Sequence, residues 1–151
     1  MRMEIHQQTL EEASTQVGGE ARMLLPGVQT LMGFQLMAVF NQRFEQFTLS
    51  EQLTHYGAFI LMAITMALMM APAAYHRQVE CDRVSGRFVV LSTRLLTFSM
   101  VPFIAGMCLD TYLIGRLITH ESTLGLAAAA GLFCVLVGLW FVVPAIVGRR
   151  R

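Results

Sequence analysis

The feature that most constrains this chain is a pair of long apolar runs that carry no charge. Tyr56 to Tyr75 and Leu124 to Val147 contain no Asp, Glu, Lys or Arg. A helix that crosses the hydrocarbon core of a bilayer needs roughly 20 apolar residues, and both runs reach that length. The composition agrees, because 55% of the 151 residues are hydrophobic and only 14% are charged. A soluble domain with so little charge could not cover its surface, so the sequence predicts an all-α integral membrane protein.

Two further apolar runs contain isolated polar residues. Met23 to Phe40 is bracketed by arginines and interrupted by three uncharged polar residues. Phe88 to Leu117 carries charged residues near both ends, which must snorkel to the interface or face protein. We therefore expect a bundle of four transmembrane helices, at about residues 23–40, 56–75, 88–117 and 124–147, in one membrane domain over residues 23–151.

The arginines set the expected orientation, because basic residues stay on the cytoplasmic side of a membrane. All 11 basic residues are arginines. Nine of them flank the predicted spans on one side, namely Arg2, Arg22, Arg77, Arg83, Arg87, Arg94, Arg149, Arg150 and Arg151. Arg43 and Arg116 flank the other side. Both termini are therefore predicted to be cytoplasmic, with the loops around residues 44–51 and 119–123 facing outward.

Residues 1–22 form the expected cytoplasmic N-terminal segment. Leu10, Ala13 and Val17 recur at helical spacing beside acidic and amide residues, which predicts a short amphipathic helix ended by Gly18 and Gly19. Such a helix could lie on the membrane surface, pack against another subunit, or lead into the first span as a solvated helix. Its thin apolar stripe favours the last of these interpretations.

Helices in lipid associate through small residues, so rows of small residues indicate packing faces. Two such rows are Ala63, Ala67, Ala71 and Ala74 in the second predicted span and Gly131, Gly138 and Ala145 in the fourth. We expect these faces to pack, either within one chain, which is the favoured interpretation, or between copies.

Gln29, Gln35 and Asp110 are the main polar groups inside the predicted spans. Each costs free energy in lipid unless it is paired or meets water. The two glutamines lie about 240° apart around a helix, so they cannot share one narrow seam. Each is expected either to form an interhelical hydrogen bond, the favoured role, or to line a pore. Asp110 lies near the predicted outer interface, where it could be hydrated, pair with an arginine, or bind a proton or cation.

Other classes of function find little support in the sequence. A formal net charge of +1 provides no basic field for nucleic acid. Met66 and Met70 stand one helical turn apart and could bind copper(I), but no histidine or cysteine joins them, and methionine is an ordinary filler of apolar packing. Neither a nucleophile with its base nor a glycine-rich phosphate loop is visible. We expect no enzyme, no metal and no cofactor.

Three local strings are more specific than the composition. They are EARMLLPGVQTLMGFQL from Glu20, NQRFEQF from Asn41 and APAAYHR from Ala71. Over roughly residues 20–116 the chain resembles the domain of unknown function 6328 family of small bacterial membrane proteins. The resemblance implies a multi-pass protein of the bacterial inner membrane and brings no established activity.

If the shared strings mark a working part, that part lies at the two ends of the first predicted hairpin. The pore or polar-network candidates are Arg22, Gln29, Gln35, Asn41, Glu45 and Asp110, and the cytoplasmic-end candidates are Tyr75, His76 and Arg77. A polar first helix among apolar ones suggests a homo-oligomer in the lipid bilayer, with the first helices around a path for small ions. The leading hypothesis is a small oligomeric ion channel or transport protein. The alternative is a non-transporting membrane scaffold or stress-response module.

Overall fold

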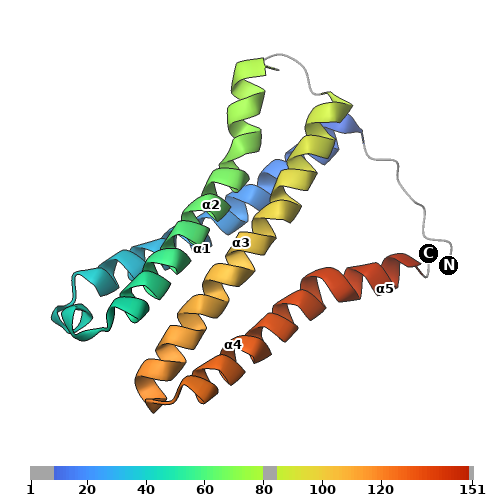
Figure 1. Ribbon diagram of the computed structural model, residues 1–151. Helices are drawn as coiled ribbons and strands as arrows, with labels where there is room; N and C mark the ends of the chain where they lie inside the picture. Colours follow the sequence, from blue (N-terminus) through green and yellow to red (C-terminus); the bar gives the residue numbers. More distant parts are fainter. Residues whose placement is uncertain (1–8, 80–84, 150–151) are drawn as a thin grey trace.

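Every regular element in the described part of the chain, residues 9–79 and 85–149 of a computed structural model, is a helix (Figure 1). In order they are α1 (Leu10–Val39), the short 3₁₀ helix η1 (Gln42–Gln46), α2 (Leu49–Val79), α3 (Gly86–Thr119), α4 (Ser122–Val137), the π-helical η2 (Gly138–Val142) and α5 (Val143–Arg149). The last three follow one another without a break and form one rod, Ser122–Arg149. The predicted all-α class is confirmed.

Three helices among the described residues are long and apolar enough to cross a membrane: α2, α3 and the rod Ser122–Arg149. They correspond to the second, third and fourth predicted spans. α1 is more polar, since its 30 residues include Glu11, Glu12, Glu20 and Arg22. The fold is therefore compatible with a membrane protein, whereas a fourth crossing by α1 and the cytoplasmic location of the termini stay predictions.

α1 joins the predicted N-terminal helix and the first predicted span in one continuous helix. It begins at a capping box, in which the Glu12 N–H donates to the Thr9 hydroxyl and the Thr9 N–H donates to the Glu12 carboxylate. The expectation that Gly18 and Gly19 end a helix is wrong. A glycine that ends a helix usually takes a left-handed conformation, and no described glycine has a positive φ. Inside a helix each glycine costs about 1 kcal/mol relative to alanine, which does not break α1.

α2 and α3 pack along a seam of small and polar side chains. On α3 the buried residues Ser92, Ser99, Gly106 and Leu113 recur every seven residues. In this seam, a Cβ on Gly106 would lie 3.1 Å from Met62 Cε and 3.3 Å from the Ala58 carbonyl oxygen. Glycine therefore lets the two backbones come together at this point, as small residues do between membrane helices.

The alanine row expected to pack on α2 is not its buried face. Ala67 and Ala74 are exposed. The buried residues of α2 lie alternately four and three positions apart and are Glu51, His55, Ala58, Met62, Thr65, Met69 and Pro72. The favoured packing within one chain is therefore wrong for these two alanines, because the buried row carries carboxylate, imidazole and hydroxyl groups, which need partners inside a bundle more than alanines need close neighbours. Packing of the alanine row between copies stays a prediction.

The rod begins against α3 and then diverges from it (Figure 1). α3 ends at Thr119, and the next residue, His120, reverses the chain with a left-handed backbone (φ 58°). Just beyond this turn, a Cβ on Gly125 would lie 2.7 Å from the Tyr112 carbonyl oxygen, so only glycine fits this crossing. Trp140 reaches back from η2 to α3, with 5.8 Å between its ring centroid and that of Phe103.

The glycine row expected to pack on the rod faces open space instead. A Cβ on Gly131 or Gly138 would meet nothing within 4 Å. The favoured packing within one chain is therefore wrong for these two glycines, because the rod has already diverged from α3 where they lie. Their face is free for lipid or for another copy of the chain.

The π-helical η2 is explained by Pro144, which follows it. Proline lacks an N–H, and its ring would clash with the carbonyl of Trp140, four residues earlier. The helix widens instead, and the Val143 N–H donates to the carbonyl oxygen of Gly138, five residues earlier. The wide turn thus coincides with the side chain that contacts α3.

Candidate functional site

Gln35, His55 and Asp110 come together from three helices at one end of the bundle. Gln35 lies in the last turns of α1, His55 in the second turn of α2, and Asp110 in the last third of α3. η1 joins α1 to α2 by a short connection, and α3 runs back alongside α2 (Figure 1). The end of α1, the start of α2 and the end of α3 therefore meet. We call these three residues the polar cluster.

Gln35 is the centre of the polar cluster. Its side chain is 6% exposed, and its Nε2 donates a hydrogen bond of 2.7 Å to Asp110 Oδ2. The other end of the amide, Oε1, is buried and finds no hydrogen-bond partner within the described residues. A buried polar group left without a partner costs about 1–3 kcal/mol. This oxygen is therefore available to accept a hydrogen bond or to ligate a cation.

The hydrogen bond of His55 fixes the role of each ring nitrogen. Nε2 lies 2.9 Å from the main-chain oxygen of Gln35. A carbonyl oxygen only accepts, so Nε2 carries a hydrogen. The nitrogen that can gain or lose a proton is then Nδ1. Nδ1 faces Oδ1 of Asp110 at 3.9 Å.

Asp110 uses one carboxylate oxygen for each neighbour. Oδ2 accepts from Gln35, and Oδ1 faces His55 at a separation that is too long for a direct hydrogen bond. Its side chain is 20% exposed, so the carboxylate is not sealed off from the surface. The cluster can therefore hold one proton on either the carboxylate or the imidazole. It can also offer two kinds of oxygen ligand, carboxylate and amide, to a small hard cation.

η1 covers His55 from the side of the α1–α2 connection. The ring of Phe44 meets the imidazole edge-on, with 5.5 Å between centroids, and Phe47 packs on Phe44 at 5.3 Å. Gln52 holds this segment in place, because its Nε2 lies 3.3 Å from the carbonyl oxygens of both phenylalanines and donates to them. The aromatic cover limits access to the polar cluster from this direction.

An ion pair lies one helical turn from His55. Glu51 caps α2 by accepting from the Thr48 N–H at 2.8 Å and from the Thr48 hydroxyl at 2.7 Å. Its second oxygen, Oε1, lies 3.5 Å from Nε of Arg116 on α3. Arg116 thus pairs with Glu51 and leaves Asp110 to His55 and Gln35. The pair ties the start of α2 to the end of α3 beside the polar cluster.

The other sequence-predicted residues of this region stay outside the polar cluster. Gln29 is exposed on α1. Asn41 and Glu45 are exposed in the connection that contains η1. Of the predicted polar-network residues, the structure brings together Gln35 and Asp110.

The predicted residues of the opposite end form a second group. Arg22 and His76 line one cavity between α1, α2 and α3. Tyr75 stacks on Phe88, with 6.1 Å between ring centroids, and His76 approaches the same ring at 5.2 Å. Arg77 is exposed.

Sequence reasoning missed His55, which completes the polar cluster. His55 lies one residue before the predicted second span, whereas α2 begins at Leu49. A helix that begins before Tyr56 places Glu51, His55 and Ala58 on its buried face at spacings of four and three. That row was the available signal.

The described residues contain no group of three or more His, Cys, Asp or Glu side chains that could hold a metal ion. The polar cluster supplies one imidazole and one carboxylate, which falls short of the ligand sets of structural or catalytic zinc sites.

Helical membrane proteins combine long apolar helices with a few buried polar side chains. This fold has three such helices around buried polar groups and is therefore compatible with that class. The chain belongs to DUF6328, a family of unknown function, whose model matches residues 4–144. This match confirms the resemblance found in the sequence and extends it beyond residues 20–116 on both sides. Neither the curated proteins nor the solved structures yield a match to this chain.

Proposed function

We propose that this chain is a small membrane transport protein that binds a proton or a small cation at its polar cluster. The observation that carries the proposal is the geometry of the imidazole. Nε2 of His55 is committed to the Gln35 carbonyl at 2.9 Å, and Nδ1 faces Asp110 Oδ1 at 3.9 Å. Carboxylates and imidazoles inside a membrane are costly, and they commonly form proton relays.

The atoms that the hydrogen bonds of the polar cluster leave free determine what the cluster can bind. A proton on the cluster resides either on Asp110, beside a neutral imidazole, or on Nδ1 of His55, beside a carboxylate. Loss of that proton leaves one negative charge on the cluster, which attracts another proton or a small cation. A cation would find the Asp110 carboxylate together with the unpaired Oε1 of Gln35.

The same proposal covers topology and assembly. With the termini in the cytoplasm of a bacterium and α1 as a fourth span of the inner membrane, the polar cluster lies toward the outer side, at the end that carries Arg43 and Arg116. Through Gln35, α1 borders the path of the transported ion. The exposed Gln29 and the open face at Gly131 and Gly138 support a homo-oligomer, because an amide in lipid and a row of small residues both favour contact with another helix.

The test uses Asp110→Asn. Asparagine keeps an oxygen that accepts from Gln35 but cannot hold a proton or a full charge. Purified protein is reconstituted into vesicles that contain a pH-sensitive dye, and proton and cation flux is followed under imposed gradients and membrane potentials. We expect flux in the wild type and its loss in Asp110→Asn, with unchanged thermal stability.

The matched control is Glu121→Gln, which neutralises an exposed acid in the α3–α4 turn at the same end of the bundle. Equal flux in Asp110→Asn and wild-type vesicles contradicts the proposal.

A second candidate is a non-transporting scaffold or stress-response module, in which the polar cluster only ties helices together. The observation that favours it is that Gln35 binds both α2 and α3, through its carbonyl and its Nε2. Wild-type vesicles that pass neither protons nor cations under any gradient would support this candidate. Replacing Gln35 would then lower stability and change nothing else.

A further inference from the structure

Two adjoining cavities flank α1 at the end of the bundle opposite the polar cluster. The larger, of about 790 Å³, lies between α1, α3 and η2, and the smaller, of about 400 Å³, lies between α1, α2 and α3. Val17, Met69 and Leu96 line both of them, so the two spaces share a wall. Both volumes fall in the range of about 300–1,000 Å³ that is usual for small-molecule sites.

The smaller cavity contains polar atoms that lack partners. Ser92 is 1% exposed, and its Oγ has no hydrogen-bond partner among the described residues. Nδ1 of His76 is likewise buried without a partner. Arg22 lines the same cavity, and none of the described lining residues is acidic. A guanidinium, a hydroxyl and an imidazole nitrogen together form a set of donors that suits the oxygens of a phosphate group. We call this space the polar cavity.

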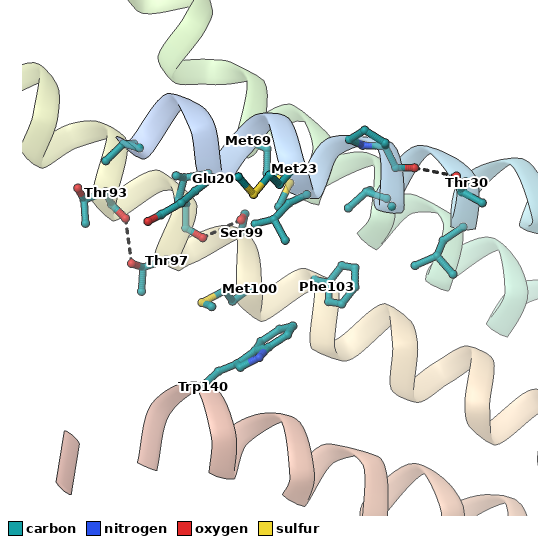
Figure 2. A pocket seen from close by; sticks show the side chains of 17 residues that line it. Glu20, Met23, Thr30, Met69, Thr93, Thr97, Ser99, Met100, Phe103 and Trp140 are labelled. Carbon is teal, nitrogen blue, oxygen red and sulfur yellow. Dashed lines mark hydrogen bonds between the residues drawn. The ribbon is translucent and has the colours of Figure 1, made fainter. Parts of the chain in front are cut away.

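The larger cavity, the apolar cavity, is lined chiefly by methionine, aliphatic and aromatic side chains. Figure 2 shows Met100 and Phe103 of α3 above Trp140 of the rod, which closes the opposite wall. Glu20 lies at the end of the cavity near Thr93 and Thr97. Glu20 and Arg22 are about 200° apart around α1, so the acid faces the apolar cavity and the arginine the polar one.

We propose that an acidic phospholipid occupies both cavities, with its phosphate in the polar cavity and an acyl chain in the apolar one. The unpartnered donors at Ser92 and His76, together with the charge of Arg22, supply the complementarity for the phosphate. Because Val17 and Leu96 line both cavities, the two spaces adjoin, and one amphiphile has its headgroup and its acyl chain in neighbouring spaces. The cytoplasmic leaflet carries anionic lipids, which fits the predicted cytoplasmic location of this end. The inference uses none of the residues of the polar cluster and does not depend on the proposed transport function.

The first experiment measures lipid retained by the purified full chain, using native mass spectrometry after delipidation. Phosphatidylglycerol, phosphatidylethanolamine and inorganic phosphate are added back separately. We expect a one-to-one adduct with phosphatidylglycerol and its loss in both Arg22→Gln and Ser92→Ala. The matched control is Arg87→Gln, which removes an exposed arginine of α3 that lines neither cavity.

A second set of variants adds side chains at glycines where the backbone has room for a Cβ. A Cβ on Gly18, Gly19 or Gly27 would meet nothing within 4 Å, and leucine favours a helix more than glycine does. Gly18 lines the polar cavity and Gly27 the apolar one, whereas Gly19 lines neither. We expect Gly18→Leu and Gly27→Leu to lose the phosphatidylglycerol adduct while they keep their helicity and thermal stability. Gly19→Leu should keep the adduct.

Three outcomes overturn the proposal. An equal adduct with phosphatidylethanolamine shows that the site does not select an acidic lipid. Protection against thermal unfolding by inorganic phosphate alone, with the adduct unchanged in Gly27→Leu, shows that no acyl chain is bound. If the folded, delipidated wild type forms no adduct after phosphatidylglycerol is added back, the two cavities hold no lipid.

Discussion

Replacing Gly125 by alanine should force α4 away from α3. The new Cβ would lie 2.7 Å from the Tyr112 carbonyl oxygen and 2.9 Å from the Arg116 nitrogen, whereas ordinary contact begins at 3.4 Å. Both neighbours are backbone atoms and cannot rotate away, so the crossing must open by several tenths of an ångström. Overpacking of this kind costs about 1–3 kcal/mol. Alanine returns up to about 1 kcal/mol through its higher helix propensity.

Gly131→Ala provides the matched comparison on the same helix. It gains the same helix propensity but meets nothing within 4 Å. Because the propensity contribution cancels between the two variants, Gly125→Ala should be less stable than Gly131→Ala by about 1–3 kcal/mol. Titration of detergent micelles with dodecyl sulfate measures this difference, with the fluorescence of Trp140, the single tryptophan, as the probe. The reasoning is refuted if both variants unfold at the same fraction of dodecyl sulfate.

In a detergent that keeps the protein monomeric, Gly138→Leu should unfold at the wild-type midpoint of the same titration, because a Cβ at this position meets nothing within 4 Å in the chain itself. A clear loss of stability would place a helix of the same chain against this face. Gln35→Leu should cost about 1–3 kcal/mol, since it strips Asp110 of a buried donor, while Gln29→Leu should be nearly neutral; equal effects would mean that the polar cluster does not form. In a cysteine-free background, a membrane-impermeant maleimide added to whole cells should label a cysteine at position 46 and not one at position 78, and the reverse pattern would invert the topology.

The sequence predicts the long helices because their long apolar runs satisfy a single physical requirement, which is burial in hydrocarbon. The same reasoning does not locate the ends of the helices. Hydropathy locates the end of an apolar run, which for the second predicted span lies at Tyr56 on the N-terminal side. The hydrogen-bonded helix begins earlier, at Leu49, with a polar first turn capped by Glu51. The expected helix end at Gly18 fails for a related reason, since composition shows that glycine is present but not which φ it adopts.

Rows of small residues do not by themselves identify the packing faces within the chain, because close approach of small side chains is only one of the interactions between helices. Gly106 and Gly125 lie at close helix crossings. Gly131 and Gly138 are glycines within an apolar helix as well, but they face open space. What separates them is where each lies relative to a neighbour, which depends on how far the rod diverges from α3 after the turn at His120. A glycine row thus permits a close approach without specifying it.

The polar cluster shows why a site can be partly visible in a sequence. Gln35 and Asp110 stand out singly, because an amide or a carboxylate within an apolar run is costly and requires a partner. Their pairing is invisible, since the two side chains are 75 residues apart and meet only through the register of α1 against α3. His55 supplies the imidazole from a position just outside an apolar run. A histidine there costs little free energy, so hydropathy does not single it out. Once α2 is extended to Leu49, His55 falls on the buried row that also contains Ala58 and Met62, and a histidine on a buried row must find hydrogen-bond partners. The carbonyl of Gln35 meets that requirement for Nε2, whereas Nδ1 faces the carboxylate of Asp110 at 3.9 Å, so the ring has one nitrogen held by a hydrogen bond and one directed at the carboxylate.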